Sequence, residues 1–318
     1  KRKPGIGMKI IEFDQFGGPD VLHVADRPAP EALDGQVLVR IEARSVNAPD
    51  AAIREGLFAD WTPWRTFPIL LGADFAGTVM HDSGTFSAGQ RVLGILPWFT
   101  DQAGRGSYAE IVAAEADWLA PLPEELDAAA GTTIPLNGLT AFQAADLLHL
   151  SAGDTVVVTG ASGTVGGFAV QAAVATGANV YAVASDGDEE YVSALGVRGI
   201  VRRGSPEQIV SSVRQLFPGG ADAVLDAAPA GPGIIGAVAD GGRFVGVLAS
   251  VAPKPERAIT VDTFSVALDQ KRLADLASQA AEGSLVTRIA ARMPLERAAD
   301  AHRLLAERST GRGRITLV

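Results

Sequence analysis

The pattern of apolar and polar residues changes character about a third of the way along the chain. From residue 8 to about residue 117, short alternating runs are broken by Gly and Pro, as at residues 37–41 and 77–80. Alternation with a period of two is typical of strands that bury one face. The first part is therefore predicted to be mostly β-structure. Residues 61–68, rich in Trp, Phe and Pro, are predicted to form a loop that either covers a pocket or packs between lobes.

Beyond residue 121, Ala-rich helical segments alternate with runs of β-branched residues. Strands are predicted at 154–159, 179–184, 199–201, 223–226 and 243–248, and helices at 165–176, 189–195, 206–217 and 234–239. Regular alternation of this kind predicts an α/β fold with a parallel, doubly wound sheet covered on both faces.

After residue 249 the pattern changes again. Helices are predicted at 264–282 and 295–307, and strands near residue 289 and at 314–318. These last elements are expected to return to the first lobe and complete it. A chain of 318 residues is expected to form two lobes. The predicted domains are residues 8–125, 126–258 and 259–318, the third segment belonging with the first.

Composition and charge exclude several classes of partner and of chemistry. The net charge of −10 argues against nucleic acid, because phosphate backbones are bound by clustered Lys and Arg. The chain has no Cys, which excludes disulfides, thiolate nucleophiles and sulfur-rich zinc sites. With no long apolar window and no apolar leader, a soluble cytoplasmic protein without a membrane partner is expected. Residues 1–7 precede Met8 and are excluded from the predicted fold.

The sequence GASGTVG follows a predicted buried strand and opens a predicted helix. Glycine permits a tight turn and lets a diphosphate approach the amides at the helix N-terminus, so this context favours a dinucleotide site. A glycine-rich turn without a ligand is the alternative. The residues expected to hold the dinucleotide here are Gly160, Ala161, Ser162, Gly163, Thr164, Val165 and Gly166.

Ser185 ends the second predicted strand of this lobe, where the residue facing the adenosine ribose sits. A small residue there admits the 2′-phosphate of NADPH, and Arg202 and Arg203 could bind that phosphate, whereas the acidic segment 186–189 would repel it. NADPH is the predicted cofactor, with NADH possible, and Arg203 is the predicted phosphate ligand. A solvated loop charge is the alternative for the two arginines.

Other segments carry a wider resemblance. They are SVNAPD (45–50) with Arg54 and Gly56, LGADFAGTV (71–79), GSYAEIV (106–112), PLNGLTA (135–141), GASGTVG (160–166) and GRGRITL (311–317). Together they resemble the medium-chain dehydrogenase/reductase superfamily, in its zinc-free quinone oxidoreductase branch related to zeta-crystallin. The resemblance implies a GroES-like β-rich catalytic domain, a Rossmann domain, a cleft between them for nicotinamide and substrate, and a homodimer.

In the zinc-dependent relatives, the position of Ala73 supplies a metal-binding His, and cysteines supply further ligands. The four histidines of this chain, His23, His81, His149 and His302, lack the close spacing of a metal site. They are predicted to be surface or packing residues, and no metal site is predicted.

Without a metal Lewis acid, an electron-poor acceptor is easier to reduce than a simple ketone. A quinone or an α,β-unsaturated carbonyl accepts hydride at carbon and spreads the charge onto oxygen. Asn47 is the candidate donor to the ribose or the substrate carbonyl, and Asp50 the group that orders its loop. Capping of a short helix near Pro49 is the alternative role for both.

Contacts to the nicotinamide are expected from Asn137, Thr140, Gly246, Val247 and Leu248. The predicted function is NAD(P)H-dependent, metal-independent reduction of a small quinone or enone. A zinc-free alcohol or aldehyde dehydrogenase is one alternative. A non-catalytic NADPH-binding regulatory protein is the other.

Overall fold

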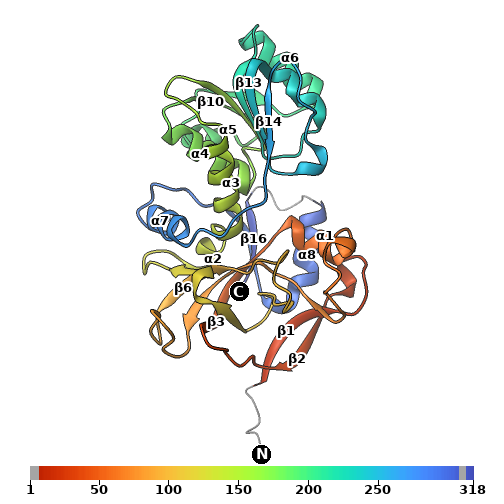
Figure 1. Cartoon of the computed structure of the whole chain (residues 1–318), viewed down its shortest axis with the longest axis vertical. Coiled ribbons are helices and arrows are strands. Elements are labelled where there is room, and N and C mark those ends of the chain that lie inside the picture. Colours follow the sequence, from red (N-terminus) through yellow and green to blue (C-terminus); the bar gives the residue numbers. More distant parts are fainter. Residues whose placement is uncertain (1–6, 308–312) are drawn as a thin grey trace, which may run out of the picture. The chain divides into compact units, whose positions relative to one another are not determined.

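The computed structural model describes residues 7–307 and 313–318, and the chain divides into two compact units. The first contains the chain up to Leu136 together with Leu268–Val318, and the second contains Asn137–Ala267. In Figure 1 the second unit runs from green to light blue. Residues 311 and 312 of the GRGRITL segment, and the stretch before Gly7, lie outside the described residues.

The second unit is a parallel sheet of order β11-β10-β9-β12-β13-β14 in the described part of the chain. Its strands are β9 Thr155–Thr159, β10 Asn179–Ala184, β11 Gly199–Arg202, β12 Ala221–Asp226, β13 Val238–Gly246 and β14 Thr260–Thr263. Its helices are α3 Pro135–Leu147, which starts at the unit boundary, α4 Thr164–Ala175, α5 Glu189–Ala194 and α6 Pro206–Leu216. This is a Rossmann sheet, and its strand order reverses between β9 and β12.

The central strand of this unit, β9, lies in its hydrophobic core. Val156, Val157 and Val158 of β9 are completely buried, because a parallel strand in mid-sheet is covered on both faces. Each such side chain contributes about 1.5–3 kcal/mol by leaving water. The continuous β-branched run in the sequence is the signature of that position.

Two predictions for this unit need correction, and one strand was missed. The helix predicted at 234–239 is a short 3-10 segment, Pro232–Ala237. Strand β13 begins at residue 238 and not at 243. Its pairing with β12 is irregular around Gly241 and Gly242, and in the sequence these two glycines look like the end of a loop. Strand β14 was not predicted, since its four residues are half-buried or exposed.

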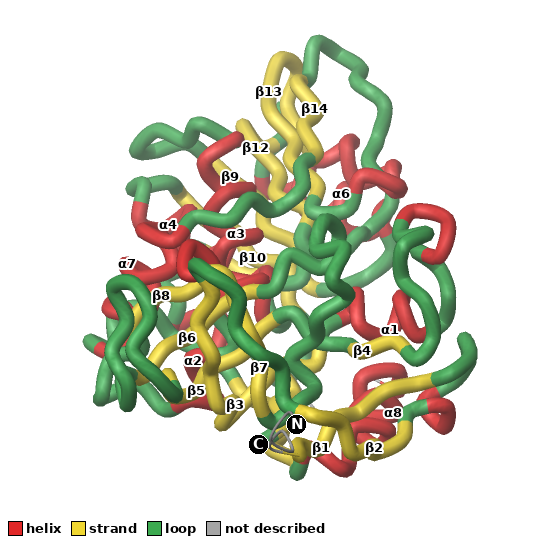
Figure 2. Tube along the Cα trace, turned by 60° about the horizontal axis from the view of Figure 1, so that its bottom comes forward, coloured by secondary structure: helices red, strands yellow, loops and turns green. Residues whose placement is uncertain are grey.

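The first unit contains two sheets within the described residues. The smaller has the order β2-β1-β4 and the larger β15-β16-β3-β5-β6-β8, with β7 also paired to β3. Figure 2 shows the larger sheet as neighbouring strands joined by long loops. The strands are β1 Gly7–Phe13, β2 His23–Pro28, β3 Gln36–Val46, β4 Ile69–Leu70, β5 Asp74–Val79, β6 Arg91–Ile95, β7 Ile111–Glu115, β8 Leu119–Pro121, β15 Ile289–Met293 and β16 Arg314–Leu317.

The helices of the first unit are α1 Ala48–Arg54, α2 Ala128–Gly131, α7 Gln270–Ala281 and α8 Ala298–Glu307. Helix α7 begins six residues later than predicted, because the Asp269 side chain caps it by accepting from the N–H of Arg272 (2.9 Å). Strand β16 pairs antiparallel with β3, which brings the C-terminal segment into the same sheet as residues 36–46. Among the described residues, no helix combines the length and the apolarity that crossing a bilayer requires.

Candidate functional site

A tight turn joins β9 to α4 at the carboxyl end of the central strand. Gly160 has a φ of +67°, and a Cβ there would lie 2.8 Å from the Cβ of Ala228. A Cβ on Gly166 would collide with the carbonyl group of Gly160. Gly163 differs, because its φ of −87° suits any residue and its Cβ would meet only the Gly160 carbonyl oxygen, at 3.3 Å. The turn itself requires Gly160 and Gly166, whereas a Cβ at Gly163 would make one tight contact, with that carbonyl oxygen.

Hydrogen bonds fasten this turn to β10. The N–H of Ala161 donates to the carbonyl of Val183 (3.1 Å), and the N–H of Ser185 donates to Oγ of Ser162 (3.2 Å). The turn is thus held to the strand end where the adenosine ribose was predicted.

The amides at the start of α4 suit an anion. The helix's bonding pattern starts with the N–H of Gly167, which donates to the carbonyl of Gly163 (2.8 Å). The N–H groups of residues 164–166 have no acceptor four residues back, and the positive end of the helix dipole lies there. A diphosphate fits these amides.

Two neighbouring strand ends lie on the same edge of the sheet. Strand β12 ends at Asp226, which pairs with Gly246 at the end of β13. Oγ1 of Thr159 donates to Asp226 (2.5 Å), and the N–H of Val247 donates to the Asp226 carbonyl (3.2 Å). The structure therefore brings Gly246, Val247 and Leu248 to the sheet edge that carries the glycine turn.

A pocket of about 420 Å³ lies beside the end of β10. It is lined by Ala184, Ser185, Asp186, Glu189, Ile200 and Arg202. The Arg202 guanidinium pairs with the Asp186 carboxylate at 2.5 Å. Arg203 is not among the lining residues, and its N–H donates to the Ala184 carbonyl (2.8 Å). Arg202 is the arginine beside Ser185.

Asn137 and Thr140 occupy the first turns of α3, three residues apart and hence on one face of the helix. Asn137 is buried and Thr140 half-buried. Their contact with a nicotinamide stays a prediction.

In the first unit, Asn47 and Asp50 are buried where β3 leads into α1. The Asp50 carboxylate accepts from the N–H of Asn47 with Oδ2 (2.7 Å) and from the N–H of Gly72 with Oδ1 (3.0 Å). Nδ2 of Asn47 donates to the carboxylate of Asp74 (2.7 Å). Asp50 thus ties the start of α1 to the segment that precedes β5.

Asp74 was not singled out from the sequence. It is fully buried and also accepts from the N–H of Leu136 (2.7 Å). Burial raises the pKa of Asp74 to about 7 and that of Asp50 to about 6, although hydrogen bonds and the nearby Arg314 guanidinium oppose the rise. The first unit therefore holds two buried carboxyl groups that titrate near neutral pH.

A directional chain of hydrogen bonds leads to Asp50. Nη1 of Arg54 lies 2.7 Å from Nδ1 of His302, and because guanidinium only donates, Nδ1 must accept. Burial lowers the pKa of His302 to about 3, so the ring is neutral and its proton is on Nε2, which faces the Tyr108 hydroxyl (3.0 Å). That hydroxyl donates to Oδ2 of Asp50 (3.5 Å). Each group in the chain points a proton toward the carboxylate.

No contiguous sequence pattern predicts this series of hydrogen bonds. Its members come from α1, α8 and the segment before β7. Arg54 and Tyr108 lie in segments that carried the family resemblance, which was the available clue. His302, expected to be a surface or packing residue, is buried in α8.

The first unit is expected to become less stable as pH rises from about 4 to about 8. Asp50 and Asp74 have folded-state pKa values of about 6 and about 7, above the ordinary 3.8, so the folded state binds more protons than the unfolded state in between. Their contribution is complete below about pH 4 and is lost as pH rises through about 6 and 7. All four tryptophans belong to this unit, so urea unfolding followed by tryptophan fluorescence measures it.

Asp74→Asn is the matched control for that profile, because an amide imitates the protonated carboxyl. The shift at Asp74 corresponds to on the order of 4 kcal/mol at most, and the variant should lose this part of the pH dependence. A profile that Asp74→Asn leaves unchanged would rule out titration of Asp74 as its cause.

The residues present do not fit the zinc centre of the zinc-dependent relatives. Ala73 stands at the position of the metal-binding His, and the chain has no Cys. In the part of the chain that the structure describes, no three His, Asp or Glu side chains are grouped to hold a metal ion. These residues therefore give no zinc ion a role in the reaction.

Comparison with known proteins gives matches along most of the chain. Residues 33–124 match the alcohol dehydrogenase GroES-like domain, and residues 195–317 match the zinc-binding dehydrogenase family. The chloroplast envelope quinone oxidoreductase homolog of Arabidopsis thaliana is 32% identical over 210 residues, which cover 63% of this chain and 62% of that protein. The probable acrylyl-CoA reductase of Escherichia coli (strain K12) is 31% identical over 226 residues, which cover 69% of this chain and 68% of that protein.

Among solved structures, the quinone oxidoreductase from Coxiella burnetii superposes with a TM-score of 0.87 at 29% identity, covering 98% of this chain and 99% of that one. By sequence, the chain spans less than two thirds of the Arabidopsis relative's length. Both units take part in these matches. The chain belongs to the medium-chain dehydrogenase/reductase superfamily, and its relatives include quinone oxidoreductases.

Proposed function

We propose that this protein transfers hydride from a nicotinamide cofactor, NADPH in preference to NADH, to a quinone or an α,β-unsaturated carbonyl. The glycine turn at the start of α4, on the carboxyl edge of a Rossmann sheet, is the observation that carries the proposal. The names of the relatives, quinone oxidoreductase and acrylyl-CoA reductase, describe reduction of electron-poor conjugated systems and support it.

The cofactor, when bound, supplies the hydride. The amides of residues 164–166 would hold its diphosphate, and the lack of a side chain at Gly163 would let it approach them. The pocket beside Ser185 would take the adenosine ribose. Because a conjugated acceptor spreads the developing charge onto oxygen, the protein's task is mainly to orient the reactants and exclude water.

In the first unit, Asn47 is the proposed hydrogen-bond donor to the ribose or the substrate carbonyl. The bond from its Nδ2 to Asp74 fixes the orientation of the carboxamide. Asp50 acts as a positioning residue, since it holds the N–H of Asn47 and is itself held by Tyr108.

Arg202→Ala is expected to weaken NADPH binding about tenfold and to leave NADH binding unchanged, because a charge-assisted hydrogen bond to the 2′-phosphate contributes about 1.5–3 kcal/mol. Calorimetric titration with each cofactor measures this. Arg203→Ala, the change suggested by the sequence, is the matched comparison and should have the smaller effect, because Arg202 lines the pocket. Equal losses for both cofactors in Arg202→Ala would remove this residue from phosphate recognition.

The proposed reaction is tested by the decay of NADPH and NADH absorbance with a panel of quinones, enones and aldehydes. We expect turnover of quinones or enones, and little with aldehydes. Turnover of aldehydes alone would favour a dehydrogenase, and tight cofactor binding without turnover of any acceptor would favour a non-catalytic binding protein.

A further inference from the structure

Asp186 lines the pocket beside β10, next to the arginine of that pocket. Strands β10 and β11 pair in parallel with Ala184 opposite Arg202, so the two segments leave the sheet side by side. The N–H of Asp188 donates to the carbonyl of Ser185 (3.2 Å), which closes a turn that contains Asp186. Oδ2 of Asp186 accepts from Nη2 of Arg202 at 2.5 Å. The pocket therefore holds a carboxylate bonded to the cation that is proposed to recognise a phosphate.

The pair between Asp186 and Arg202 lies in water, since the Arg202 side chain is 78% exposed and that of Asp186 66%. An ion pair at this exposure contributes little to stability, and breaking it leaves no buried group unsatisfied. Among the described residues, the Arg202 guanidinium has this one hydrogen-bond partner. Arg202 can therefore exchange the carboxylate for a stronger acceptor at low cost.

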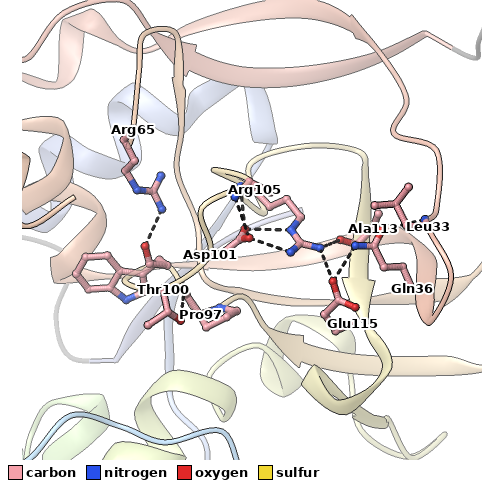
Figure 3. Close-up of polar contacts among 11 residues, drawn as sticks. Leu33, Gln36, Arg65, Pro97, Thr100, Asp101, Arg105, Ala113 and Glu115 are labelled. Carbon is pink, nitrogen blue, oxygen red and sulfur yellow. Dashed lines mark hydrogen bonds and ion pairs between the residues drawn. The ribbon is translucent and has the colours of Figure 1, made fainter. Parts of the chain in front are cut away.

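Arg105 of the first unit shows the opposite arrangement. It forms two hydrogen bonds to the Asp101 carboxylate (2.8 and 3.0 Å) and a further one to Glu115 (3.2 Å), so its guanidinium lies between the two acids (Figure 3). Its side chain is 19% exposed and that of Asp101 only 3%, so neither can leave without stranding a largely buried charge. Arg105 is fixed to the protein, whereas Arg202 has one exposed partner and can turn to a ligand.

A 2′-phosphate and the Asp186 carboxylate are acceptors for the same guanidinium. A phosphate ester carries about −1.5 to −2 charges at neutral pH and binds arginine with two parallel hydrogen bonds, so it displaces the carboxylate. NADPH must therefore break the pair between Asp186 and Arg202 when it binds. NADH has a hydroxyl group at the 2′ position and leaves the pair intact. Direct repulsion between carboxylate and phosphate is the smaller effect here, because exposed charges are screened by water and salt.

We propose that Asp186 is a specificity-determining residue, which competes with the 2′-phosphate of NADPH for Arg202 and so limits the preference for NADPH over NADH. The inference rests on the proposed function and concerns the cofactor preference of the same site. Glu189 lines the same pocket, but its Oε2 accepts from the N–H of Gly187 (2.8 Å). Glu189 is therefore assigned no part in this competition.

Calorimetric titration of the full chain with NADPH and NADH tests the inference. We expect Asp186→Asn to tighten NADPH binding about fivefold, the upper range for losing an exposed ion pair, and to change NADH binding less than about twofold. Glu189→Gln is the matched control, because it removes a negative charge from the same pocket and keeps an acceptor for the N–H of Gly187. It should change NADPH binding less than about twofold. Equal gains in the two variants would show that the total charge of the pocket sets the preference, and would overturn the inference.

The combination with Arg202→Ala shows whether Asp186 acts through this arginine. In the Arg202→Ala background we expect Asp186→Asn to tighten NADPH binding less than about twofold, because carboxylate and phosphate then have no guanidinium to compete for. A fivefold gain in that background as well would mean that Asp186 only repels the phosphate, and the competition would be refuted.

Two adenosine phosphates that lack the nicotinamide separate this inference from the proposed function. The gain in Asp186→Asn should appear with adenosine 2′,5′-bisphosphate and be absent with adenosine 5′-monophosphate, since only the first carries a 2′-phosphate. Turnover of no acceptor would defeat the proposed function, whereas these affinities would still decide the role of Asp186. Unchanged binding of the bisphosphate in Asp186→Asn would overturn the inference even in an active reductase.

Discussion

Gly163→Asp is expected to abolish dinucleotide binding while the fold is kept. A side chain at this position would stand at the N-terminus of α4, where the diphosphate is proposed to lie. Like charges about 4 Å apart repel by about 4 kcal/mol at a protein surface, which predicts a loss of more than about a hundredfold in affinity. Residue 163 is also the N-cap of α4, where Asp is among the preferred residues, so the helix should remain intact.

Calorimetry with NADPH measures the loss, and Gly163→Ala separates charge from size. Its methyl group meets only the Gly160 carbonyl oxygen, at 3.3 Å, so we expect a much smaller effect than with Asp. Normal affinity in Gly163→Asp would show that the diphosphate does not lie at this turn, and the proposed redox function would lose its support.

Asp50→Asn is expected to lower the unfolding free energy of the first unit by about 3 kcal/mol at about pH 4. Both carboxylate oxygens of Asp50 are used, Oδ1 by the N–H of Gly72 and Oδ2 by the N–H of Asn47 and the hydroxyl of Tyr108. An amide offers one accepting oxygen, so in either orientation its NH₂ faces a buried donor. Each donor left unsatisfied costs about 1–3 kcal/mol.

Urea unfolding followed by tryptophan fluorescence gives the measurement, and Asp60→Asn, an exposed change in the same unit, is the control. Because the raised pKa of Asp50 makes the wild type lose stability as pH rises through about 6, the deficit of Asp50→Asn should be smaller at about pH 8 than at about pH 4. An unfolding midpoint equal to that of Asp60→Asn would show that these hydrogen bonds contribute little.

Elements with a strong local pattern could be predicted from the sequence. The β-branched run of β9 and the alternation of such runs with helical segments allowed β10, α4 and α6 to be predicted to within one or two residues. Elements whose limits depend on tertiary contacts could not be located in this way. The short strand β14 exists because it pairs with β13, and α7 starts where Asp269 can cap it.

The same distinction applies to the candidate site. The glycine turn is contiguous in sequence, so its residues and their order could be recognised directly. The environment of Asp50 is not contiguous, because Gly72, Tyr108 and His302 reach it through strand pairing and helix packing. Similarly, the sequence offered both Arg202 and Arg203 as phosphate ligands and favoured Arg203, and only the structure shows that Arg202, the last residue of β11, lines the pocket beside Ser185.

The place of β16 bears on how the protein is made. The strand lies between β15 and β3, inside a sheet whose other members are mostly synthesised first, whereas the second unit is one uninterrupted segment. Domains generally fold as they leave the ribosome, in the order of synthesis. The second unit can therefore fold before β15 and β16 are synthesised. The first unit, most of which precedes the second in sequence, can be completed only after it.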